Sequence, residues 1–119
     1  MRYCSVASGS SGNCHYIEAG GVRVLWILGL PEQQLFLLFK RFLVDVGLSL
    51  KAIEANLRLR GIAPESIQAI FVTHEHSDHI KGVGAWARRY HIPVFATEGT
   101  WHGMERSMGR IESEKCYSI

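Results

Sequence analysis

Three histidines and two carboxylates fall within six residues of this chain, in the segment THEHSDH at residues 73–79. Imidazole together with carboxylate is a typical donor set for zinc, and manganese and iron are further candidates. His74 and His76 lie two apart in an expected extended loop, so they point the same way. Asp78 and His79 enter the following helix from a different angle. The spacing therefore suits two adjacent metal ions, one held by each pair.

The flanking sequence places this segment at the rim of a sheet. Residues 67–73 contain the apolar run AIFV, typical of a buried strand, while Ile80, Val83, Ala87 and Tyr90 repeat with helical period. A loop at the end of a buried strand can turn several side chains toward one point. A chance polar loop fits this placement poorly. A single structural zinc site fits poorly as well, because such sites usually contain cysteine and none lies nearby.

The rest of the chain alternates strands with helices. Residues 2–7 and 14–18 are expected to form a β-hairpin around SGSSGN, a sequence rich in turn-forming residues. Further strands are expected at 22–25, 43–46 and 92–96, and further helices at 50–60 and 98–108. This alternation indicates an α/β sandwich.

Composition narrows the class of protein. The chain has 119 residues, 47% of them hydrophobic, and a formal net charge of +2, which fits one globular domain and excludes a disordered tail or a fibrous repeat. So small a charge argues neither for nor against nucleic acid. Cys4, Cys14 and Cys116 do not form a disulfide framework, and this indicates a reducing compartment.

The most hydrophobic stretch of the chain, residues 24–46, is interrupted by Pro31 and by several polar and charged residues. Its longest apolar runs fall short of the roughly 20 residues that span a bilayer. We therefore expect a soluble, cytoplasmic protein without a membrane segment.

HxHxDH after an apolar strand resembles the metallo-β-lactamase fold superfamily of metal-dependent hydrolases. The family's early Asp-Gly element matches LVDVG at residues 43–47. Together with ASGSSGN, VTHEHSDHIKGV and ATEGTW, it resembles one bacterial branch, the small cytoplasmic DNA exonucleases linked to the cell-wall two-component regulatory operon. The match covers residues 1–25 and 43–110. It implies an α/β fold, the N-terminal half of an αββα metallo-β-lactamase sandwich.

Carried over position by position, the resemblance implies that His74 and His76 bind a first divalent ion and that Asp78 and His79 bind a second. Zinc is the expected metal, with manganese as an alternative. Asp78 is also the expected catalytic residue, because it would help to orient a hydroxide that bridges the two ions. Asp45 would lie behind the ligands and accept hydrogen bonds from the metal loop, or it would simply cap a turn at the strand end.

The function that the resemblance implies is a metal-dependent phosphodiesterase, a DNA exonuclease whose hydroxide attacks phosphorus. Because the motif defines the metal site and not the substrate, hydrolysis of a thioester or a lactam is an alternative. A non-catalytic metal-binding fragment is a third possibility. Lys81, Arg88 and Arg89 either face a phosphate backbone or form an ordinary solvated surface.

The chain departs from the family pattern after His79. A further histidine, a bridging aspartate and a last histidine normally come from the second half of the fold. Residues 80–119 contain no aspartate, and their only histidines are His91 and His102, which we interpret as solvent-exposed. We therefore expect residues 1–119 to form a partial metallo-β-lactamase domain, whose partners are the missing C-terminal half and DNA.

A second departure is the segment at residues 26–42. Removing it joins residues 22–25 to 43–47 as one continuous apolar strand, as the family has. We interpret residues 26–42 as an atypical insert outside the half-sandwich. A partner-binding amphipathic helix is the alternative.

Overall fold

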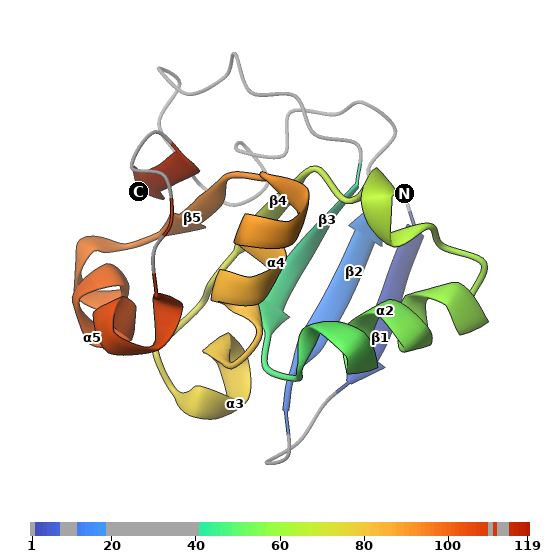
Figure 1. The fold of residues 1–119 in the computed structure, drawn as a ribbon, viewed down its shortest axis with the longest axis horizontal. Helices are drawn as coiled ribbons and strands as arrows, with labels where there is room; N and C mark the ends of the chain where they lie inside the picture. Colours follow the sequence, from blue (N-terminus) through green and yellow to red (C-terminus); the bar gives the residue numbers. More distant parts are fainter. Residues whose placement is uncertain (1, 8–11, 19–40, 110, 112–114) are drawn as a thin grey trace.

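The computed structural model describes residues 2–7, 12–18, 41–109, 111 and 115–119, and Figure 1 shows their arrangement. The strands are β1 (Arg2–Ala7), β2 (Cys14–Glu18), β3 (Arg41–Val46), β4 (Ala69–Phe71), β5 (Val94–Ala96) and β6 (Cys116–Ser118). The helices are α2 (Leu50–Leu59), α3 (Ser77–Ile80), α4 (Val83–Tyr90) and α5 (Glu98–Met108), with a 3₁₀ turn, η2, at Pro64–Ser66.

These strands form one sheet in the order β1-β2-β3-β4-β5-β6. The pairs β1–β2 and β2–β3 are antiparallel, and the three later pairs are parallel. Parallel neighbours need helical crossovers, and α2, α4 and α5 each lie in one of the three connections. Helices α2 and α4 cover one face of the sheet (Figure 1). The fold is thus mixed α/β, as the sequence predicts.

The main core lies between this helical layer and the sheet. Leu43, Ile70 and Val94 project from neighbouring strands and pack in one cluster with Ile53 of α2 and Trp86 of α4. A smaller aromatic cluster occupies the other face of the sheet. Its buried members are Phe42, Ala69, Phe71 and Phe95. Burial on both faces explains why β4 and β5 read as continuous apolar runs.

Helix α2 follows directly from its sequence. Ser49 caps it, with the side-chain oxygen accepting a hydrogen bond from Ala52 N at 3.3 Å. Ile53 and Leu57, four apart, are both fully buried. Gly61 lies just past the end with a φ of 73°, a left-handed conformation that favours glycine.

Strand β3 carries a bulge at Asp45. Cys14 pairs with Val46 and His15 pairs with Val44, so Asp45 has no partner in β2, and its φ is 62°. The extra residue returns Val46 to the same face as Leu43, and both are fully buried. Bulges re-aim side chains at sheet ends, and here the bulge accompanies a carboxylate directed at the histidine segment.

The observed start of β3 corrects the predicted end of the insert. Arg41 and Phe42, which the sequence pattern assigns to the atypical insert, belong to β3, and Phe42 is 1% exposed. A side chain buried against the aromatic cluster cannot be part of an excursion from the sheet. The expected strand at 22–25 and the remainder of the insert lie outside the described residues.

Three other differences concern the second half of the chain. The strand expected at 67–73 is limited to β4, since the η2 turn precedes it and the chain bends after Phe71. The helical pattern from Ile80 to Tyr90 is divided into α3 and α4, because Gly82 N donates to Val46 O at 2.7 Å. Strand β6 was not predicted. Among the described residues, none of the helices has the length and apolar character needed to cross a membrane.

Candidate metal centre

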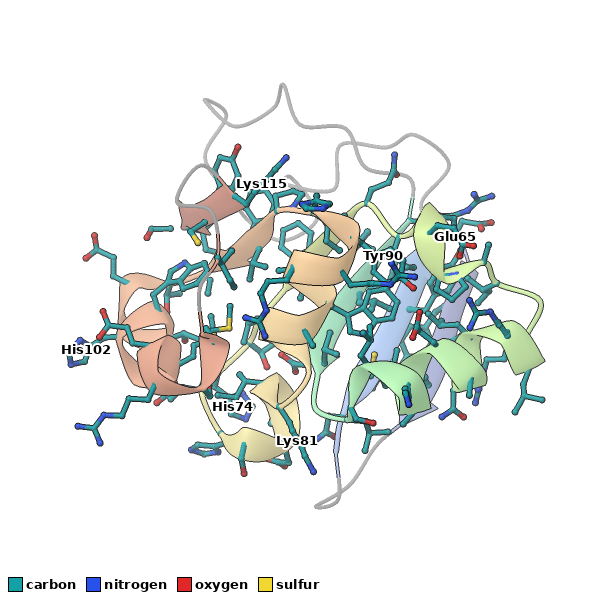
Figure 2. The ribbon with its side chains drawn as sticks, viewed as in Figure 1. Glu65, His74, Lys81, Tyr90, His102 and Lys115 are labelled. Carbon is teal, nitrogen blue, oxygen red and sulfur yellow. The ribbon has the colours of Figure 1, made fainter. Side chains whose placement is uncertain are left out.

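The histidine segment, residues 73–79, follows β4 at the carboxyl end of the parallel strands. The end of β3 reaches the same edge, because β3 and β4 are parallel. Helix α3 begins inside the segment, and Figure 1 shows it at this end of the sheet. His74 and Lys81 lie at this end of the molecule in Figure 2. The bulged strand and the segment therefore meet at one edge, as expected for a loop after a buried strand.

Asp45 is the acceptor around which this edge is organised. Its side chain is buried, with the whole residue only 3% exposed. Oδ1 accepts from Thr73 N at 2.8 Å, and Oδ2 accepts from Thr73 Oγ1 at 2.8 Å. Nδ1 of His79 lies 2.6 Å from Oδ2. Since a carboxylate only accepts, Nδ1 carries the hydrogen and Nε2 keeps the lone pair that a metal ion uses.

The ring of His74 lies close to the rings of both other histidines of the segment. The ring centroids of His74 and His79 are 3.7 Å apart, and those of His74 and His76 are 4.9 Å apart. His74 Nδ1 contacts Thr73 Oγ1 at 3.0 Å. His76 is exposed, and its side chain makes no helix-capping bond at the start of α3.

Asp45 contacts Nδ1 of the His79 ring, and Asp78 lies near its other nitrogen, Nε2. Oδ2 of Asp78 is 3.7 Å from His79 Nε2. The side-chain amide of Asn13 donates to the same Oδ2 at 3.1 Å. Asn13 and Thr73 thus belong to the site, although neither was singled out as a site residue from the sequence. The signal that points to Asn13 is an amide directly before a strand in a glycine- and serine-rich turn.

The donors available here suit divalent ions of the zinc type, because they are imidazoles and a carboxylate. We refer to His74 and His76 as the first pair, and to Asp78 and His79 as the second pair. Within the described residues, however, no three His, Cys, Asp or Glu side chains converge as a group that could hold an ion. Each pair fits as half of a ligand set, with further ligands to come from elsewhere.

The other histidines do not join this group. His102 is exposed on α5 and points away from the molecule in Figure 2. His91 is exposed and ends α4 with a φ of 53°. His15 stacks on Tyr3 with a ring-centroid distance of 5.7 Å. The structure thus agrees with the sequence in leaving His91 and His102 outside the site.

Two further groups contribute to the surroundings of the site. Cys14 is fully buried, and burial raises the pKa of its thiol, with the nearby Asp45 carboxylate adding to the effect. The thiol therefore stays neutral and acts as a small apolar side chain. Lys81 is exposed beside α3. Arg88 is instead used structurally, since its guanidinium donates to Met108 O.

Comparison with known proteins assigns the family. The model of the metallo-β-lactamase superfamily matches residues 36–115, which include β3, Asp45 and the whole histidine segment. The chain belongs to the metallo-β-lactamase superfamily. The matched region runs from before the bulged strand to α5 and beyond, so the family extends over most of the described fold.

Two curated relatives of this chain are named exodeoxyribonucleases. The chain is 40% identical over 115 residues to exodeoxyribonuclease YycJ of Bacillus anthracis. It is also 40% identical over 117 residues to exodeoxyribonuclease WalJ of Streptococcus pneumoniae. Each match covers 97% of this chain and 37% of the relative, so the chain spans little more than a third of their length.

Solved structures of metallo-β-lactamases share the fold. A B3 enzyme with an active-site glutamic acid is similar over 86% of this chain and 32% of its own, with a TM-score of 0.61 and 25% identity. The Rm3 metallo-β-lactamase is similar over 93% of this chain and 34% of its own, with a TM-score of 0.61 and 21% identity. These likenesses establish the metallo-β-lactamase fold for this chain.

Proposed function

We propose that this chain carries part of the dinuclear metal centre of a DNA-hydrolysing phosphodiesterase. His74 and His76 are ligands of one divalent ion, and Asp78 and His79 are ligands of the other, with zinc as the favoured metal. The observation that carries the proposal is the bond between buried Asp45 and His79 Nδ1 at 2.6 Å. This bond leaves the lone pair of His79 Nε2 available for an ion, and Nε2 lies 3.7 Å from Asp78 Oδ2.

The chemistry of the proposed reaction assigns a task to each residue. Two bound ions would supply Lewis acidity, lowering the pKa of a coordinated water and stabilising charge on a phosphodiester. Asp45 fixes the tautomer and the ring plane of His79, while Thr73 ties the start of the histidine segment to the same carboxylate. Asp78 would help to orient the attacking hydroxide. Lys81, exposed at this end, is placed to contact a backbone phosphate.

DNA as the substrate is supported by the two relatives named exodeoxyribonucleases. Each shares 40% identity with nearly all of this chain. The solved lactamases share the fold at lower identity, and so hydrolysis of a lactam or thioester is the competing activity for the same centre. Location in the cytoplasm is part of the proposal, because a bacterial enzyme that hydrolyses cellular DNA would meet its substrate there.

Two measurements test the proposal. The complete protein that contains this chain should degrade linear double-stranded DNA, lose that activity with a chelator and regain it with zinc or manganese. Turnover of a small thioester or lactam, with DNA left intact, would assign the competing activity instead. The variant Asp78→Asn is the matched control, since it keeps the size of the side chain and removes its charge.

The 119-residue chain by itself is expected to show no DNA turnover above a metal-ion blank. Each pair supplies only two donors, and an ion held by two donors is too loosely positioned for catalysis. Strong turnover by the purified chain would show that these residues complete the site. Zinc bound with no turnover in either form would support a metal-binding fragment without catalysis.

A further inference from the structure

The backbone of Asn13 is fixed from two sides. Its N–H donates to Asp78 O at 2.6 Å, and its carbonyl accepts from Gly47 N at 2.8 Å. A Cβ on Gly47 would lie 1.8 Å from Asp78 O and 2.6 Å from Asn13 N, so this close approach of three segments needs a glycine. These contacts use only main-chain atoms and remain whatever side chain follows Gly12.

The side chain of Asn13 is directed at the second pair. Nδ2 lies 3.1 Å from both Oδ2 and the main-chain oxygen of Asp78, and 3.4 Å from His79 Nε2. The Asp78 carbonyl already accepts from Asn13 N. A carbonyl oxygen has two lone pairs, so the amide can give one hydrogen to this oxygen and one to Oδ2. His79 Nε2 has one lone pair, which a bound ion would use in place of its contact with the amide.

We infer that Asn13 is a positioning residue, whose amide orients the Asp78 carboxylate toward the imidazole of His79. The inference rests on the proposed function, in which these two side chains hold the second ion. An amide is suited to the task because it offers two hydrogens without a charge. A hydroxyl offers one, and a carboxylate offers none and repels Asp78.

The first experiment needs no metal. In the metal-free 119-residue chain, the three-bond coupling between N and Cγ of Asp78 reports whether its χ1 occupies one rotamer. We expect one rotamer in the wild type and an averaged coupling in Asn13→Ala. Asn13→Asp keeps the shape of the side chain and the main-chain contacts but lacks the donors, so it should give the same averaging if Asn13→Ala folds poorly. A single unchanged rotamer in a folded variant overturns the inference.

The second experiment is a zinc titration followed by the imidazole nitrogen signals of each histidine. In Asn13→Ala, the zinc dissociation constant read at His79 should rise about tenfold. The zinc dissociation constant read at His74 and His76 should stay within about twofold of the wild-type value. A twofold change is smaller than the loss expected when a residue that supports a ligand is removed. The matched control is Asn56→Ala, which loses an amide that donates to Ala52 O at 2.9 Å on α2. It should leave all three constants unchanged.

The outcomes separate this inference from the proposed function. An equal loss at all three histidines, together with a lower thermal midpoint of the metal-free chain, would make Asn13 merely structural and overturn the inference. The complete protein that contains this chain tests the metal assignment, and the absence of a saturable zinc response at these histidines there would refute it. The Asp78 coupling would then still decide whether Asn13 orients that carboxylate.

Discussion

The two pairs of proposed ligands differ in how firmly the fold holds them. In the second pair, His79 is bonded to buried Asp45, and the Asp78 carboxylate accepts from Asn13. In the first pair, His76 is exposed, and His74 has a contact with Thr73, its own neighbour. The second pair is therefore anchored by two distant segments of the chain, and the first pair is held by local structure.

This difference has an energetic meaning. A side chain ordered by the fold has already lost its rotamer freedom, so binding an ion to it costs less. The second pair should accordingly bind a metal ion more tightly than the first in this chain. It should also depend directly on residues far from it in sequence, whereas the first pair should depend on them only indirectly, through the contact of His74 with Thr73.

The largest effect is expected from Asp45→Asn. Asparagine tolerates the left-handed φ of 62°, but it replaces an acceptor by a donor facing Thr73 and His79. The free energy of unfolding should fall by about 1–3 kcal/mol. Zinc affinity read at His79 should fall about 10–100-fold, with a smaller loss at His76. Denaturation of the metal-free protein measures the free energy of unfolding, and a zinc titration measures the affinity at each pair. An equal loss of zinc affinity at the two pairs would contradict the view that the fold holds the second pair more firmly.

The next effect concerns Gly47, where a Cβ would lie 1.8 Å from Asp78 O. Gly47→Ala forces a main-chain shift, so the free energy of unfolding should fall by about 1–3 kcal/mol and zinc affinity should fall at the second pair. Gly99→Ala is the control, because a Cβ added there on α5 would have no atom within 4 Å. Its stability should stay the same or rise. Equal behaviour of the two variants in urea denaturation would argue against this close contact.

His76→Ala should act on metal binding alone. Because His76 is exposed, the free energy of unfolding should change by no more than about 0.5 kcal/mol. Zinc uptake at the first pair should be abolished, since one remaining donor in water binds weakly. Equilibrium dialysis with metal analysis measures the stoichiometry. Loss of zinc from the second pair as well would mean that the two pairs form one coupled site.

The smallest effect at the metal centre is expected from deleting residues 26–40. They join β2 to β3 at the end of β3 opposite Asp45, and shortening that connection lowers the cost of closing it by roughly 1 kcal/mol. Soluble yield and thermal midpoint should rise, while the zinc response of both pairs should not change.

The control deletion, residues 26–42, also removes Phe42, which is 1% exposed, and should lower both yield and midpoint. A loss of yield and midpoint on deleting residues 26–40 would instead show that this segment is packed and structural.

Local patterns in the sequence were sufficient to predict much of this fold. Ser49, the Ile53–Leu57 spacing and Gly61 define α2, and helix α5 has the predicted bounds, Glu98–Met108. Each of these signals is contained within a few neighbouring residues. The same holds for the histidine segment, whose donors are so close in sequence that one loop brings them together.

The features that sequence did not reveal depend on distant contacts. The bond from Asn13 to Asp78 Oδ2 joins residues 65 apart. The bond from Thr73 to Asp45 joins residues 28 apart, and it was the resemblance, not a local pattern, that implied an acceptor role for Asp45. The break between α3 and α4 arises from the contact of Gly82 with Val46 O. Strand β6 has three residues, too few to show a period, and its pairing with β5 defines it.

The strand order has a consequence for how the chain folds. Each described strand after β1 pairs with the described strand that precedes it in sequence, so the sheet can grow by adding each strand to its newest edge. Such growth can proceed while the chain emerges from the ribosome, starting from the hairpin of β1 and β2. The bond between Asn13 and Asp78 closes a much longer loop and must wait for β3 and β4. The edge that carries the candidate metal centre is thus completed after β3 and β4 have paired, and it needs neither β5 nor β6.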